Sequence, residues 1–334
     1  MTLTISERLS SPELLDSRAA WFARLEDLFA GGPAEQVFRM LGIMKYTEAD
    51  GPDWYVWMDR SLAELGEDAE RAADPRVFRP LILNYNPHGV HFIDHLLGAE
   101  VFQMEDASWQ AHPLSAPIGS LQPPDLDHLP GWQVMKDFAR AFLSRDVRGV
   151  IFALPTIASA LNIALNLYGQ EILAALYEDP DAARHDLRVI NEVLCDIHRW
   201  YLAHIPPEQM QCIVPDGRCQ PPGYGQLCGC STQLLSPRLY RDFVAPLDAG
   251  LLAVYPHGGM IHLCGAHAQH IPTWRAMPEL RSVQLNDRAS EDLDLYFNGL
   301  HEDQVLYVHP CAGMPVERIL DITGGKRLVL VSDS

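Results

Sequence analysis

Short apolar runs alternate with longer stretches of helical periodicity over most of the chain after residue 75. The runs lack the polar alternation of a half-exposed strand, so they are typical of strands buried on both faces of a parallel sheet. Strands are predicted at residues 79–85, 147–154, 211–215, 280–287, 304–309 and 327–331, and another ends at His262 and Cys264. Helices are predicted at residues 132–142, 158–176, 179–204, 292–300 and 316–322, from residue 236, and across residue 274.

Repeated strand–helix units of this length predict a parallel sheet with right-handed crossovers. We therefore predict an α/β fold, a closed (β/α)8 barrel of the TIM type with an N-terminal helical extension. An open doubly wound sheet is the alternative, but no Gly-x-Gly-x-x-Gly motif follows an early strand. Residues 1–75 are predicted to form a helical cap and residues 76–334 the barrel, with the proline-rich stretch 113–130 as an irregular loop.

Charge and composition narrow the possible partners. The 334 residues include 25 basic and 44 acidic ones, for a formal net charge of -19, which argues against binding nucleic acid or an anionic membrane surface. No apolar run reaches the roughly 18 residues of a membrane span. The first residues are too polar for a secretory signal, so we expect a cytoplasmic protein. The seven cysteines are then expected to be reduced, and all of them fall between Cys195 and Cys311.

The sequence Gly258-Gly259-Met260-Ile261-His262-Leu263-Cys264-Gly265 carries the clearest candidate chemistry. Residues two apart in a strand point to the same side, so the His262 imidazole and the Cys264 thiol are expected to lie side by side. Both are ligands of the kind that zinc takes. The alternative is a core histidine beside a buried free cysteine.

Polar residues recur where the other predicted strands end, and in a barrel these ends form the active-site rim. This coincidence favours a functional metal site over a chance pair. The strand-end residues are Asn84, Tyr85, Asp216, His262, Cys264, Asp287, Cys311, Ser332 and Asp333.

Roles can be assigned to several of these residues. Tyr85 and His88, at a strand end and in the turn after it, are predicted to contact substrate. His91 and His95 share one helical face, a spacing that can bind metal, but a polar pocket lining is the simpler interpretation. Asp216 and Asp287 are candidate catalytic residues that would orient a histidine ligand, hold a substrate amine or transfer a proton. Each aspartate is equally explained as a helix cap or salt-bridge partner.

Three segments together resemble the uroporphyrinogen decarboxylase superfamily. They are Ser236-Pro237-x-x-Tyr240-x-x-Phe243-x-x-Pro246, Pro256-x-Gly258-Gly259 and His262-x-Cys264-Gly265. The resemblance covers roughly residues 75–334, and it is closer to the zinc-dependent methyltransferases that move methyl groups from corrinoid proteins to thiols. No match to the arginine-rich N-terminal motif of true uroporphyrinogen decarboxylases is present.

The resemblance implies zinc bound by His262, Cys264 and a third cysteine, with an open position for a substrate thiol. In that branch the third cysteine lies on the last barrel strand, which has none here. Cys311, one strand earlier, is the nearest substitute. Cys228 or Cys230 could instead reach the site from their loop. The resemblance also implies a corrinoid, free or on a partner protein, and a homodimer.

Two other functions stay open from the sequence. One is a metal-independent decarboxylase or lyase on the same barrel, with Asp216 or Asp287 stabilising a developing cation or donating a proton. The other is a non-enzymatic small-molecule binder with structural zinc held by Cys219, Cys228, Cys230 and Cys264.

Overall fold

The strands of the protein form two parallel sheets and one small antiparallel pair. The computed structural model describes residues 3–32, 38–40, 43–46, 53–106, 108–155, 158–212 and 218–331. The larger sheet has the order β1 (Phe38–Met40), β12 (Leu328–Val331), β11 (Val305–Val308), β10 (Leu280–Leu285), β9 (Gly259–Leu263) and β8 (Gly225–Cys228). The second sheet has the order β2 (Ile43–Tyr46), β3 (Leu81–Asn84), β6 (Val150–Ala153) and β7 (Met210–Gln211). The antiparallel pair is β4 (Val101–Gln103) and β5 (Trp109–Ala111).

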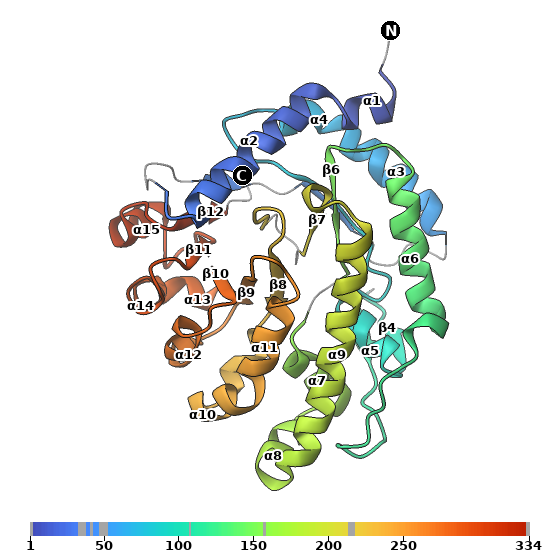
Figure 1. Ribbon diagram of the computed structural model, residues 1–334, viewed down its shortest axis with the longest axis vertical. Coiled ribbons are helices and arrows are strands. Elements are labelled where there is room, and N and C mark those ends of the chain that lie inside the picture. The colour runs from blue at the N-terminus through green and yellow to red at the C-terminus, as the bar shows by residue number, and fades with distance from the viewer. Residues whose placement is uncertain are drawn as a thin grey trace.

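Helices lie around the outside of these strands (Figure 1). The α-helices are α1 (Ile5–Leu9), α2 (Pro12–Phe29), α3 (Trp54–Glu67), α4 (Ala69–Ala72), α5 (Phe92–Leu96), α6 (Pro130–Leu143), α7 (Ala160–Tyr168), α8 (Glu171–Glu178), α9 (Pro180–His204), α10 (Pro237–Leu239), α11 (Ala245–Leu252), α12 (Ile271–Arg275), α13 (Arg288–Glu291), α14 (Leu293–Gly299) and α15 (Val316–Thr323). Single turns of other helix types are η1 (Gly89–His91), η2 (Leu126–His128), η3 (Pro207–Gln209), η4 (Cys230–Leu234), η5 (Tyr240–Val244) and η6 (Ala268–His270).

The larger sheet is linked to the second sheet at both of its edges. β1 and β2 follow one another in the chain, although they belong to different sheets. At the other edge of the larger sheet, a parallel bridge joins Cys228, at the end of β8, to Ala158, which follows β6, an inner strand of the second sheet. The predicted α/β class with parallel strands is confirmed. Closure into an eight-stranded barrel stays a prediction, because the ladder through the described residues is not continuous around a ring.

One inner core links the two sheets to the N-terminal helix α2. The inward side chains of β3, β6, β9, β11 and β12 form a single buried cluster with apolar residues of α2. Phe29 at the end of α2 packs edge to face on Tyr307, with ring centroids 6.4 Å apart. Pro12 at the first helical position and the Ser11 side chain, which accepts from the Leu14 N–H, fix where α2 begins.

Most strands form where the apolar runs predicted them, but two predictions were wrong in part. The first stretch was predicted to be helical, whereas β1 and β2 lie within it. They are only three and four residues long and mix apolar with basic residues, so neighbouring strands rather than local propensity determine them. The division into a cap and a barrel stays a prediction.

The second error concerns β8, which was predicted to be loop. Its sequence Gly-Gln-Leu-Cys has a single strongly apolar residue and begins with glycine, which weakens a strand locally. Pairing with the backbone of β9 over four residues supplies the missing stability. This strand has a direct bearing on the candidate site.

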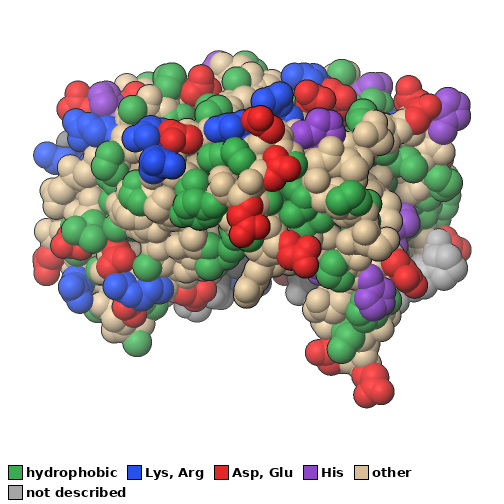
Figure 2. All heavy atoms as spheres, turned by 90° about the horizontal axis from the view of Figure 1, so that it is seen from below, with side chains coloured by type: hydrophobic (Ala, Val, Ile, Leu, Met, Phe, Trp, Pro, Cys, Tyr) green, Lys and Arg blue, Asp and Glu red, His purple; other side chains and the backbone are tan. Residues whose placement is uncertain are grey.

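Charged side chains of both signs are interspersed with histidine and apolar side chains on the face shown in Figure 2. Within the described part of the chain, the helices are too short or too polar to cross a membrane.

Candidate metal centre

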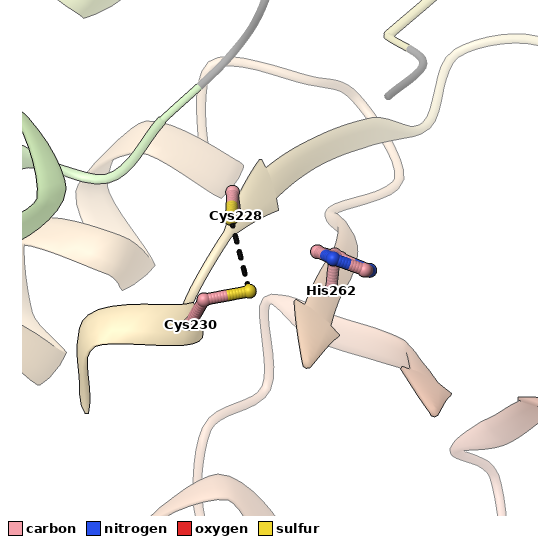
Figure 3. A group of neighbouring side chains, drawn as sticks. All are labelled: Cys228, Cys230 and His262. Carbon is pink, nitrogen blue, oxygen red and sulfur yellow. Dashed lines mark hydrogen bonds between the residues drawn. The ribbon is translucent and has the colours of Figure 1, made fainter. Parts of the chain in front are cut away.

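The parallel pairing of β8 with β9 places Cys228 directly opposite His262. Residues in register on neighbouring parallel strands point to the same side of the sheet, so the thiol and the imidazole face the same space. Both lie at the carboxyl ends of their strands. His262 is buried and Cys228 is partly buried. Figure 3 shows the two side chains side by side.

A tight turn at Gly229 then returns the chain so that Cys230 joins the pair. The Gly229 N–H donates to the His262 carbonyl oxygen over 2.9 Å. A Cβ at this position would lie 2.7 Å from Ile261 Cγ2, so only glycine allows this close approach. Cys230 begins η4, and its Sγ lies 3.3 Å from Cys228 Sγ. Figure 3 shows this contact as a dashed line.

Cys264 completes the cluster from the turn after β9. Its Sγ lies 2.8 Å from Cys230 Sγ, so Cys230 stands between the other two thiols. The ligand atoms of Cys228, Cys230 and His262 all lie within 4.8 Å of one another. Cys264 is not part of that compact group of three and joins it through its contact with Cys230. We call Cys228, Cys230, His262 and Cys264 the Cys3His cluster.

The protonation of the three thiols is unequal. Hydrogen bonding from Cys230 lowers the pKa of Cys228, and it also lowers the pKa of Cys264, with His262 contributing to both. The pKa of Cys230 is raised, because its hydrogen-bond contacts with Cys228 and Cys264 and its burial favour the protonated thiol. The three thiols are therefore of unequal acidity, and a bound cation would favour the ionised form of each.

His262 is held through one ring nitrogen. Its Nδ1 contacts the Gln284 side-chain oxygen, and Arg218 Nη1 lies 2.9 Å from the same atom. Gln284 occupies the position opposite His262 on β10. Metal-binding histidines usually have one nitrogen on the metal and the other hydrogen-bonded to a carbonyl or carboxylate. Nδ1 can donate to Gln284 or accept from Arg218, and with Nδ1 engaged Nε2 would be the nitrogen that binds a metal.

The donor set fits zinc. Three sulfurs and one imidazole are ligands of the zinc type, and tetrahedral sites with Zn–S bonds of about 2.3 Å separate sulfurs by about 3.8 Å. The Cys228 and Cys230 sulfurs are close to that spacing at 3.3 Å, whereas the Cys230 and Cys264 sulfurs, 2.8 Å apart, would have to separate by about 1 Å for both to bind one zinc ion.

Cys311 and Cys219 lie elsewhere in the described structure. Cys311 follows β11, where its backbone pairs with Met314. Its side chain packs against the larger of the two hydrophobic clusters, which we call the outer core. Cys219 is fully buried in the inner core. Neither belongs to a described group of potential metal ligands. The geometry thus brings together the loop cysteines that the sequence offered as the alternative to Cys311, and it does not assemble the four-cysteine structural set.

Asp287 lies close enough to Cys264 for its negative charge to raise the pKa of that thiol, against the hydrogen bonds that lower it. It is exposed and follows β10, with φ +47° and ψ −125°. It occupies the N-cap position of α13 without a side-chain capping bond. The helix-cap explanation therefore does not account for this carboxylate.

Other predicted site residues lie in different surroundings. Tyr85 stacks on Phe138 in the outer core, with ring centroids 4.5 Å apart. His88 packs against His95 and Trp109, and burial lowers its pKa to about 4. Their substrate contacts stay predictions. Asp216, Ser332 and Asp333 lie outside the described residues.

The histidine pair on the helix after β3 does not form a metal site among the described residues. His91 Nδ1 is instead 2.6 Å from Asp94 Oδ2, which also accepts from Asn166 Nδ2 over 2.8 Å. Asn162, one turn earlier on α7, donates to Cys228 Sγ over 3.6 Å. The sequence shows Asn162 and Asn166 as polar residues of an apolar helix, but it does not indicate their partners.

Comparison with known proteins shows similarity in structure only. No protein-family model matches the sequence, and a search of curated proteins found no match. A methyltransferase from Methanosarcina mazei has a similar structure, with a TM-score of 0.63 over 93% of this chain and 91% of that chain. The two sequences are 12% identical. This likeness establishes a shared fold.

Proposed function

We propose that the protein is a zinc-dependent group-transfer enzyme of the methyltransferase type, which activates a thiol or similar small nucleophile. The observation that carries this proposal is the Cys3His cluster at the carboxyl ends of β8 and β9, where parallel α/β folds place their active sites. The structural likeness to a methyltransferase supports it.

Cys230 and His262 are the central ligands in this proposal. Cys230 contacts both other cysteines, so any ion bound by the cluster lies beside it. Cys228 and Cys264 flank it, and zinc held by three protein ligands, as Cys228, Cys230 and His262 could supply, would keep a fourth position open for a substrate thiol. Zinc lowers the pKa of a bound thiol so that it becomes a nucleophile near neutral pH. Gln284 orients His262, and Asn162 holds the thiol of Cys228.

Asp287 is proposed to hold a cationic group of the substrate or to accept its proton, because its exposed carboxylate lies near Cys264. The same role is proposed for Asp216, which lies outside the described residues. The methyl donor would be a corrinoid, free or carried by a partner protein. A homodimer also stays a proposal.

Elemental analysis of the purified protein tests the metal site. We expect one zinc per chain in wild type, loss of that zinc in Cys230→Ser and His262→Ala, and retention in Cys311→Ser. Cys311→Ser is the matched control, because it removes a partly buried strand-end thiol outside the Cys3His cluster. Well-folded wild type that contains no metal and takes up none would refute the proposal. Full activity after chelation would favour the metal-independent lyase instead.

A further inference from the structure

A fully buried histidine connects the two turns that carry the cysteines. His267 Nε2 accepts a hydrogen bond from the Gly265 N–H over 3.2 Å, and Gly265 directly follows Cys264. On the other side of the ring, His267 Nδ1 lies 3.0 Å from Thr232 Oγ1. The same hydroxyl lies 2.8 Å from the carbonyl oxygen of Gly229, between Cys228 and Cys230.

One assignment of protons satisfies this chain. A backbone N–H can only donate, so His267 Nε2 must be the acceptor. In a neutral imidazole the proton then sits on Nδ1 and is donated to Thr232 Oγ1. Thr232 in turn donates its hydroxyl proton to the Gly229 carbonyl oxygen, which can only accept. A protonated His267 would break the first bond, because Nε2 would face another donor.

We propose that His267 is a positioning residue, which acts through Thr232 to hold the Cys264 turn against the Cys228–Cys230 turn. This inference rests on the proposed metal site. It assigns to His267 a role that the metal ligands themselves do not reveal, because none of the hydrogen bonds of His267 in the described structure goes to one of the four.

Close packing between the same two turns supports this role. A Cβ at Gly265 would lie 2.1 Å from the side-chain oxygen of Gln233 in η4, so the turn after β9 rests directly on the helix that begins at Cys230. His270 holds Thr232 from another direction, with Nε2 2.9 Å from its carbonyl oxygen. The backbone N–H of His270 also donates to the His267 carbonyl oxygen over 2.9 Å, so His270 reinforces the same link between Thr232 and the segment after Cys264.

The arrangement of the thiols depends on this connection. Cys230 and Cys264 come from different segments, and their sulfurs lie 2.8 Å apart only while the two turns are held together. Loss of outer hydrogen bonds around metal ligands typically lowers metal affinity by about 10- to 100-fold. We expect an effect of this size when the link through His267 is cut.

The test measures the zinc dissociation constant by competition with a chromophoric chelator. His267→Ala removes the imidazole, and Thr232→Val removes only the hydroxyl while keeping the shape of the side chain. Thr232→Ser keeps the hydroxyl and is the matched control. His198→Ala is a second control, because it removes an equally buried imidazole that bonds to Tyr255 away from the cluster.

We expect His267→Ala and Thr232→Val to weaken zinc binding by about 10- to 100-fold, with Thr232→Ser and His198→Ala close to wild type. The losses of zinc affinity should not be additive in the variant that combines His267→Ala with Thr232→Val, because both substitutions break the same chain of hydrogen bonds. Wild-type affinity in both Thr232→Val and His267→Ala would overturn the inference.

Hydrogen exchange separates this inference from the proposed function. Wild type that binds no zinc would refute the metal site. The Gly265 amide of the metal-free protein would still test the link, because its exchange should be faster in His267→Ala and unchanged in His198→Ala. Unchanged exchange in His267→Ala would refute the link independently of zinc.

Discussion

Cys228 and His262 occupy opposite positions in the parallel register of β8 and β9, and this pairing defines the candidate metal centre. The pairing depends on the Gly229 turn that follows Cys228. Gly229→Ala would drive a methyl group into Ile261, so we expect weaker zinc binding and a loss of stability of about 1–3 kcal/mol. Equilibrium denaturation and zinc titration measure the two effects.

Gly250→Ala is the control for that substitution. A Cβ at Gly250 in α11 would make only an ordinary contact, at 3.7 Å from Asn191 Nδ2. Alanine is favoured over glycine in a helix by about 0.5–1 kcal/mol. Gly250→Ala should therefore leave zinc binding intact and not destabilise the protein. Equal behaviour of the two variants would contradict the role given to Gly229.

The cysteines of the metal-free protein should differ in reactivity. Thiolates are the reactive form, and the pKa values of Cys228 and Cys264 are lowered while burial raises those of Cys212 and Cys219. Alkylation mapped by mass spectrometry should therefore reach Cys264, the more exposed of the first two, at mildly acidic pH and leave Cys212 and Cys219 unmodified. Zinc should protect Cys264. Labelling of Cys219 before Cys264 would contradict this assignment.

Local sequence predicts part of this site, but it does not show which residues come together from neighbouring strands. The two-residue spacing of His262 and Cys264 places both on one side of β9 or its end, because side chains alternate along a strand. The contribution of Cys228 depends on the register between β8 and β9, which no local pattern in Gly-Gln-Leu-Cys reveals. The apolar runs likewise predict the buried strands, whereas the packing of α2 against the inner core is a tertiary contact between distant segments.

Asp287 combines an unusual backbone conformation with a charge near the cluster. A non-glycine residue at φ +47° and ψ −125° is strained, at a cost of about 1–3 kcal/mol. Asp287→Gly should relieve the strain and stabilise the protein by roughly 1 kcal/mol in urea denaturation. Asp287→Asn should keep the strain but remove the charge, and so increase the alkylation rate of Cys264. Destabilisation by Asp287→Gly would show that the side chain supports the fold instead.

Asp248 should make stability depend on pH. Burial raises the pKa of this carboxyl to about 7, although its hydrogen bond from Tyr240 opposes the shift. In the unfolded chain the carboxyl loses its proton near pH 4. The native state therefore binds more protons between about pH 4 and pH 7, and the free energy of unfolding falls as the pH rises through that interval.

Asp248→Asn should remove this dependence, because the amide cannot ionise and its oxygen still accepts from Tyr240. We expect the difference in unfolding free energy between pH 5 and pH 8 to shrink by at least about 1 kcal/mol. Asp242→Asn, at an exposed carboxylate of η5, is the control. An identical pH profile for wild type and Asp248→Asn would contradict the prediction.

X-ray absorption at the zinc edge of the purified protein tests the Cys3His cluster most directly. The cluster predicts two or three sulfur ligands at about 2.3 Å and one nitrogen ligand at about 2.0–2.1 Å, with one sulfur fewer in Cys230→Ser if that variant is reloaded with zinc. Zinc bound only by oxygen and nitrogen ligands, or a sulfur count unchanged in Cys230→Ser, would contradict the assignment of these residues as the metal centre.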